Sequence, residues 1–181
     1  MGLYSYEENR FLRKSIRIVT DIIVVVSIAW FIVYSFLNQT IVSGNSMSPS
    51  LEADEMCLVN RLSYDLGKPE RYDIILFERN DTGKTNIKRI IGLPGETVRI
   101  SGGIIYINGE ALKDDRIGDV SLGGIAENGI ELADDEYFVI GDNSNSSEDS
   151  RFSNIGNVNK SAIKGKLWLR IRPFSKFGGL K

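Results

Sequence analysis

The chain has 181 residues, of which 42% are hydrophobic and 25% are charged, so most of it should form one globular domain with a short appendage. Its net charge of −2 argues against a nucleic-acid-binding protein, because such proteins usually carry a basic stripe. There is no histidine, and Cys57 is the single cysteine. An intrachain disulfide is therefore excluded, no zinc or other metal site is expected, and Cys57 is interpreted as a small buried hydrophobic residue.

An apolar segment near the N-terminus is the first predicted element. Ile22–Leu37 is 16 residues without a charge, and extension back to Ile16 gives 22 residues, or roughly 33 Å of helix. Arg17 and Asp21 lie four positions apart on one helix face, so they can pair at the end of the span. A cleaved secretory signal would have a shorter apolar core and a small-residue exit, and a buried core helix would be amphipathic. We therefore predict an uncleaved transmembrane helix over residues 16–37.

The basic residues around this span predict its orientation. Four of them precede it: Arg10, Arg13, Lys14 and Arg17. After the span the first basic residue is Arg61, and acidic residues come before it. The positive-inside rule then puts residues 1–15 in the cytoplasm and residues 38–181 outside. The sequence therefore predicts a single-pass type II protein of the cell membrane.

The rest of the chain is predicted to be mostly β-structure. Short runs rich in β-branched and aromatic residues alternate with turn residues. Gly102-Gly103 and Asn108-Gly109 are predicted hairpin turns. The expected strands are Ile41–Val42, Met56–Leu62, Ile74–Phe77, Thr85–Leu93, Thr97–Ile100, Ile104–Ile107, Glu136–Ile140 and Lys164–Ile171.

Five motifs in this region resemble those of one enzyme family, the bacterial type I signal peptidases (leader peptidases) in their small, Gram-positive form. Ser46–Leu51 is similar to the family's Ser-Met-x-Pro-Thr-Leu box, and Arg71–Phe77 to its Arg-Gly-Asp-Ile-Val-x-Phe strand. Lys88–Glu96 resembles Lys-Arg-x-x-Gly-x-Pro-Gly-Asp, and Tyr106–Glu110 resembles Tyr-x-Asn-Gly. Gly141–Arg151 matches Gly-Asp-Asn-x-x-x-Ser-x-Asp-Ser-Arg. The resemblance implies an antiparallel β-sheet catalytic domain behind one transmembrane helix.

The resemblance also implies a serine endopeptidase with a serine–lysine dyad and no cofactor. Ser46 matches the nucleophile and Lys88 the general base. A serine needs a base to attack a carbonyl at neutral pH, and a desolvated lysine between apolar neighbours is a base that a chain without histidine can supply. Ser147 matches the serine that orients the lysine. The backbone N–H of Ser46 is one expected oxyanion donor, whereas the second is unassigned because Gly44 stands where Gram-negative members have a serine.

Other residues of the motifs receive supporting roles by the same resemblance. Met47 and Pro49 are expected to shape the loop of Ser46 and to touch the substrate. A structural set of ion pairs beside Lys88 is expected from Arg89, Asp142, Asp149 and Arg151. Ser144 departs from the family pattern, which has an arginine there, and Tyr72 replaces a glycine.

The expected substrates are preproteins that carry a signal peptide, cleaved at the outer face of the cytoplasmic membrane after small residues such as Ala. Membrane lipid is an expected partner, contact with the secretion translocon is compatible with this location, and nucleic acid is not expected. Two alternatives remain open. One is a catalytically inactive homologue that acts as an assembly partner, although such proteins lack the serine or the lysine. The other is a self-cleaving serine–lysine repressor, which would need a DNA-binding domain.

Overall fold

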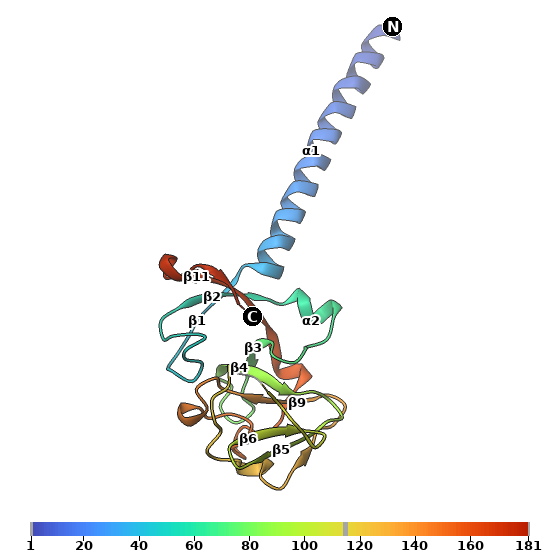
Figure 1. Cartoon of the computed structure of the whole chain (residues 1–181). Helices are drawn as coiled ribbons and strands as arrows, with labels where there is room; N and C mark the ends of the chain where they lie inside the picture. The colour runs from blue at the N-terminus through green and yellow to red at the C-terminus, as the bar shows by residue number, and fades with distance from the viewer. Residues whose placement is uncertain (1, 114–115, 181) are drawn as a thin grey trace.

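A computed structural model describes residues 2–113 and 116–180. Met1, the first residue of the predicted cytoplasmic segment, and Lys181, the last residue of the predicted outer domain, lie outside the described residues. One long helix, α1 (Gly2–Phe36), projects from a β-rich domain that contains the C-terminal end of the chain (Figure 1). The helix begins before the predicted span and ends one residue earlier than predicted, at Phe36. Residues Arg10–Phe36 are long and apolar enough to cross a membrane.

The exposed surface of α1 distinguishes a membrane span from the buried core helix of a soluble protein. Its apolar side chains are not covered by the domain; Val25 is 64% exposed and Trp30 66% exposed. A core helix of a soluble protein would be covered by other elements, so this interpretation is excluded. At its end the helix is attached to the domain, because Arg61 N–H donates to the Ser35 carbonyl (3.1 Å) and Trp168 Nε1 donates to the Phe36 carbonyl (3.4 Å).

The predicted fold class is confirmed, because the domain consists mostly of antiparallel β-structure. A large sheet has the order β1-β2-β11-β3-β4-β9-β10, with β12 paired to β11. Its strands are β1 (Asn38–Ile41), β2 (Met56–Asn60), β3 (Ile74–Glu78), β4 (Thr85–Gly92), β9 (Glu136–Ile140), β10 (Val158–Asn159), β11 (Ile163–Arg172) and β12 (Gly178–Gly179).

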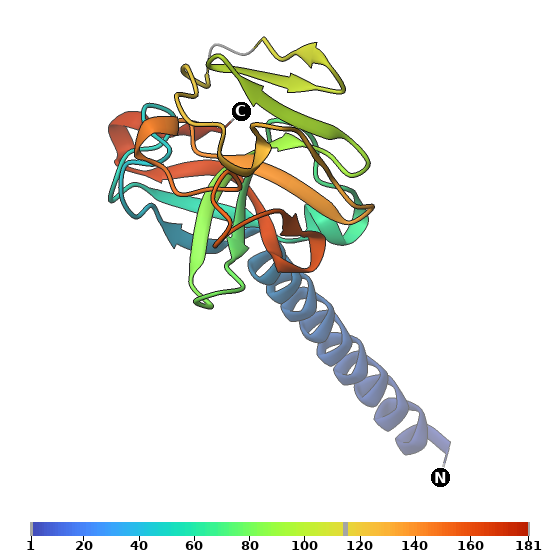
Figure 2. The same cartoon turned by 90° about the horizontal axis from the view of Figure 1, so that it is seen from below.

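A small sheet has the order β7-β6-β5-β8 and lies on the side of the domain away from α1 (Figures 1 and 2). Its strands are β5 (Thr97–Ser101), β6 (Ile104–Ile107), β7 (Glu110–Ala111) and β8 (Ile130–Glu131). The turn at Gly102-Gly103 joins β5 to β6, as its residue types predict. Short helical turns complete the chain: α2 (Leu62–Leu66), η1 (Gly124–Ala126), η2 (Ser144–Ser146), η3 (Lys160–Ala162) and η4 (Phe174–Lys176).

One predicted strand, Met56–Leu62, is wrong at its C-terminal end. The strand ends at Asn60, and Leu62 begins α2. The side chain of Asn60 accepts a hydrogen bond from the Ser63 N–H (3.1 Å). Asparagine side chains compete in this way with the backbone ladder and favour a turn. The strands of only two residues, β7, β8, β10 and β12, are too short for a periodic sequence pattern.

The domain core has three clusters of buried side chains, and one of them supports the functional site. Met47 and Leu51, from the loop between β1 and β2, pack there with Cys57, Ile74 and Leu167. Cys57 is fully buried, and burial raises the pKa of its thiol to about 11, with a smaller contribution from the charge of Glu55. The cysteine is therefore a core residue.

Candidate active site

Ser46 and Lys88 meet although 42 residues separate them in the chain. Lys88 Nζ donates a hydrogen bond to Ser46 Oγ at 2.8 Å. Ser46 lies in a turn of the loop between β1 and β2, and the next residue, Met47, is buried and anchors that turn in the core. Lys88 comes from the middle of β4, where it pairs with Ile75 of β3. The structure therefore brings the two predicted residues into direct hydrogen-bond contact.

The environment of Lys88 favours the neutral amine that a base requires. The side chain is only 3% exposed. Burial, which penalises the charged form, lowers the pKa of Lys88 from 10.5 to about 8. Four nearby charges act in opposite directions: Asp149 and Glu148 raise this pKa, whereas Arg79 and Arg151 lower it. About a tenth of the amine is therefore unprotonated at neutral pH.

Gly141 brings a second backbone segment against the dyad. A Cβ atom at this position would lie 2.4 Å from the Ser46 carbonyl oxygen and 2.4 Å from Ser147 Oγ, so only glycine fits. The neighbouring Asn143 N–H donates to the same Ser46 carbonyl (3.0 Å), and the Asn143 side chain donates to the Asn45 carbonyl (3.2 Å). The serine loop and the loop after β9 are thus fixed to each other.

Ser147 lies close to the dyad, but the hydrogen bond expected between it and Lys88 is not formed. Its Oγ is buried and has no hydrogen-bond partner among the described residues. A buried hydroxyl without a partner costs about 1–3 kcal/mol, which is the cost of its desolvation. The hydroxyl is therefore available to a group that enters the site.

Two buried ion pairs hold the loop that contains Ser147. Arg89 binds Asp142 through two hydrogen bonds (2.8 and 2.6 Å), and Arg151 binds Asp149 in the same manner (2.7 and 2.9 Å). The Arg151 guanidinium also donates to the carbonyls of Ser144 and Ser147. Paired guanidinium–carboxylate forks are the geometry in which buried charges are tolerated.

The two residues that depart from the family motifs, Ser144 and Tyr72, each have a hydrogen-bond partner in the structure. Ser144 Oγ donates to the Asp119 carbonyl at 3.0 Å. Tyr72, at the other departure, has a positive φ of 73°, and its carbonyl accepts a hydrogen bond from Arg89 (2.8 Å).

A groove of about 190 Å³ opens onto the dyad. Its lining residues are Thr40, Ile41, Val42, Ser43, Ser46, Met47, Leu76, Arg79, Thr85, Asn86, Ile87, Lys88 and Glu148. Met47 contributes to this lining, but Pro49 does not and lines a separate cavity with Asn143. The edge strand β1 forms one wall, so its free side can accept an extended peptide.

The oxyanion donors are only partly defined. The Ser46 N–H donates no hydrogen bond within the described part of the chain, so it is free to bind an oxyanion. Gly44 has a positive φ of 73° and carries no side chain that could supply a second donor. Within residues 2–113 and 116–180 no cluster of three or more His, Cys, Asp or Glu side chains could hold a metal ion.

Among the groove residues that sequence reasoning missed are the two whose charges act on Lys88, Arg79 and Glu148. Arg79 lies just beyond the Arg71–Phe77 motif, and Glu148 occupies a variable position of the last motif. Neither has a local pattern that predicts a place beside Lys88, because their approach depends on the folding of two distant loops.

Comparisons with known proteins agree with the motifs. A family model described as "Signal peptidase, peptidase S26" matches residues 15–171. A probable signal peptidase I-2 of Synechocystis is 32% identical over 94% of this chain and 78% of its own length. A signal peptidase I of Bacillus caldolyticus is 37% identical over 76% of this chain and 80% of its own length. A crystal structure of a signal peptidase I from Enterococcus faecalis matches 55% of this chain and 97% of that chain, with 34% identity and a TM-score of 0.49.

Proposed function

The chain belongs to the signal peptidase family, peptidase S26, and is a serine endopeptidase that removes signal peptides from preproteins; we propose that Ser46 is its nucleophile and Lys88 its general base. The observation that carries the proposal is the 2.8 Å hydrogen bond from Lys88 Nζ to Ser46 Oγ. A nucleophile within hydrogen-bond reach of a base with a perturbed pKa is the arrangement that covalent catalysis needs.

Each step of the proposed reaction uses the same two residues. Neutral Lys88 takes the proton of Ser46 Oγ as this oxygen attacks the carbonyl carbon of the scissile bond. The C–N bond then breaks, Lys88 gives the proton to the leaving amine, and the signal peptide stays bound to Ser46 as an ester. Lys88 next takes a proton from an attacking water. The ester bond breaks, the proton returns to Ser46, and the signal peptide leaves as a carboxylic acid.

Three neighbours support these steps in the proposal. The free Ser46 N–H stabilises the oxyanion in each tetrahedral intermediate. Ser147, whose buried Oγ lacks a partner, orients the Lys88 amine when the substrate displaces water from the groove. The buried ion pairs of Arg89 and Arg151 hold both loops in place. Apolar residues of the groove lining, such as Ile41 and Leu76, suit the small residues before the cut.

The protein is anchored in the membrane by its N-terminal apolar helix. We propose that residues 1–15 lie in the cytoplasm, that residues 16–37 span the membrane and that residues 38–181 lie outside. The bonds from Arg61 and Trp168 to the end of α1 leave no flexible linker between membrane and domain. Phe174 in η4 and Phe177 just after it are exposed (79% and 61%), which suits contact with lipid. Confinement at the outer surface raises the effective concentration of substrate, including one delivered by a translocon.

Cleavage of a purified preprotein by the full-length chain in detergent micelles tests the dyad. Ser46→Ala and Lys88→Ala should each lower kcat by at least about a thousandfold. Ser48→Ala, on the same turn but bonded to Glu52, is the matched control and should keep wild-type activity. Retention of full activity by either dyad variant would rule out the assignment.

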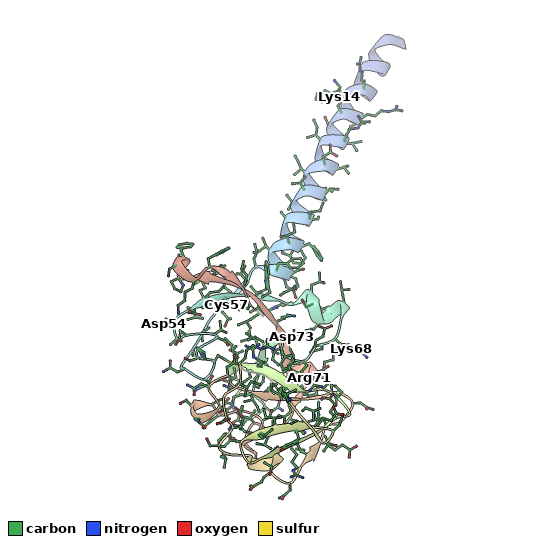
Figure 3. All side chains as sticks on the ribbon, viewed as in Figure 1. Lys14, Asp54, Cys57, Lys68, Arg71 and Asp73 are labelled. Atoms are coloured by element: carbon green, nitrogen blue, oxygen red, sulfur yellow. The ribbon has the colours of Figure 1, made fainter. Side chains whose placement is uncertain are left out.

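Labelling of single cysteines in intact cells tests the orientation. Figure 3 shows Lys14 on α1, far from the domain, and Lys68 at the outer edge of the domain. A membrane-impermeant maleimide should modify Lys68→Cys at once and Lys14→Cys only after permeabilisation. The native Cys57 is buried and should stay unlabelled in both. The reverse pattern would contradict the proposed topology.

A further inference from the structure

The turn between β3 and β4 places one arginine at the wall of the groove. Arg79 begins this turn; its N–H donates to the Lys84 carbonyl (2.8 Å), and its carbonyl accepts from the Gly83 N–H (2.9 Å). Its side chain lines the groove together with Ser46 and Lys88. None of the sequence motifs includes Arg79, and the reaction as described above does not use it.

The Arg79 guanidinium is held from two sides. Asp81, in the same turn, accepts two hydrogen bonds from it (2.9 and 2.6 Å). Glu148, in the loop that also contains Ser147, accepts a third at 3.2 Å. The Arg79 side chain is only 13% exposed. A guanidinium fixed by a bidentate carboxylate is pre-organised, so its charge has a constant position relative to the site.

The charges that face Lys88 form two opposed pairs. Asp149 and Arg151 are bound to each other, and Glu148 and Arg79 are bound to each other. Asp149 and Glu148 favour the protonated amine, whereas Arg79 and Arg151 disfavour it. Loss of Arg79 or of Glu148 therefore removes one charge that acts on Lys88 and leaves the opposite charge in place, although Arg79 also stays bound to Asp81.

We propose that Arg79 is a positioning residue of the dyad: fixed by Asp81 and paired with Glu148 at the groove wall, its charge disfavours the protonated Lys88 amine and so increases the fraction available as a base. This inference rests on the proposed role of Lys88. The competing explanation is purely structural, namely that the Arg79–Glu148 pair only ties the β3–β4 turn to the loop of Ser147.

The two explanations differ in the sign of the effects. Arg79→Gln and Glu148→Gln break the same ion pair, so a structural role predicts similar losses for both. An electrostatic role predicts opposite shifts in the pH dependence of kcat/KM. Removal of the cation stabilises protonated Lys88 and moves the acid limb to higher pH, whereas removal of the carboxylate moves it to lower pH.

The experiment is the pH profile of kcat/KM for the full-length chain in detergent micelles with a signal-peptide-bearing substrate. In Arg79→Gln the midpoint of the acid limb should move up by about half a pH unit, so kcat/KM at a pH below the limb should be about threefold lower. In Glu148→Gln the midpoint should move down by a similar amount. Arg79→Lys and the double variant should stay near wild type. Arg99→Gln, on the small sheet, is the control for loss of a surface arginine.

Each outcome has a distinct meaning. Equal losses at all pH values in both single variants, with an unmoved limb, would overturn the role of Arg79 while the role of Lys88 stands. A wild-type profile without any limb between pH 6 and 9 would overturn the role of Lys88 and this inference with it. Because the Glu148 side chain is 63% exposed, the shift in Glu148→Gln should also shrink in 1 M salt, and a shift that does not change with salt would contradict the electrostatic role.

Discussion

The buried amine of Lys88 should make the domain less stable than an apolar residue would. The pKa of Lys88 falls from 10.5 to about 8 on folding, and one unit corresponds to about 1.36 kcal/mol. The unfolded chain therefore binds this proton more tightly than the folded chain does. The resulting penalty is fully present below pH 8 and fades as the pH rises toward 10.5; it is about 3 kcal/mol at pH 7 and about 1.5 kcal/mol at pH 9.5.

Lys88→Met removes this penalty while keeping a side chain of similar length. The variant also loses the hydrogen bond to Ser46, which offsets about 1 kcal/mol. We expect an inactive protein whose free energy of unfolding is about 2 kcal/mol higher than wild type at pH 7, with a gain that shrinks to near zero at pH 9.5.

Urea unfolding of the full-length chain in detergent micelles, followed by circular dichroism, measures these differences. Ser46→Ala is the matched control, because it loses the same hydrogen bond but keeps the buried lysine. Its stability difference from wild type should not change sign or size between the two pH values. The reasoning would be refuted if Lys88→Met were less stable than wild type at pH 7, or if its gain did not depend on pH.

Three further predictions concern activity and the loops around the dyad. Wild-type kcat/KM should rise with pH through about 8, and a rate that is flat down to pH 5 would contradict a lysine base. Gly141→Ala should lower activity at least about tenfold, because the new methyl group would press on the Ser46 carbonyl, whereas Gly118→Ala, which has open space, should be neutral. Asp142→Asn removes the negative charge that pairs with the buried Arg89, so it should lower the free energy of unfolding by about 3 kcal/mol in urea titrations. A loss under about 1 kcal/mol would contradict this.

The strands and the dyad could be predicted because their information is local. Runs such as Thr97–Ile100 alternate with turn residues, and most of the predicted bounds agree with the structure within a residue or two, whereas β1 begins three residues before the predicted Ile41–Val42. Ser46 and Lys88 each lie in a short ordered motif. Their approach to 2.8 Å follows from the resemblance and not from spacing, because nothing in a strand pattern states that β4 lies next to the serine loop.

The long-range arrangement could not be predicted from the sequence for the same reason. Strand β11 lies between β2 and β3, although about a hundred residues separate it from β2. The buried Glu55 binds Arg170 and Lys176 across a similar interval. A sequence period gives the face that a strand buries but not its neighbours, so pairs like these, and Arg79 with Glu148, required the fold.

The most direct test of the dyad is to trap the ester intermediate. Wild-type protein is mixed with excess preprotein, quenched with acid within one turnover, digested and analysed by mass spectrometry. We predict that the signal-peptide acyl group is attached to Ser46, and that the adduct is absent from both Ser46→Ala and Lys88→Ala. An adduct on another residue, or one that persists in Ser46→Ala, would contradict the assignment of the nucleophile.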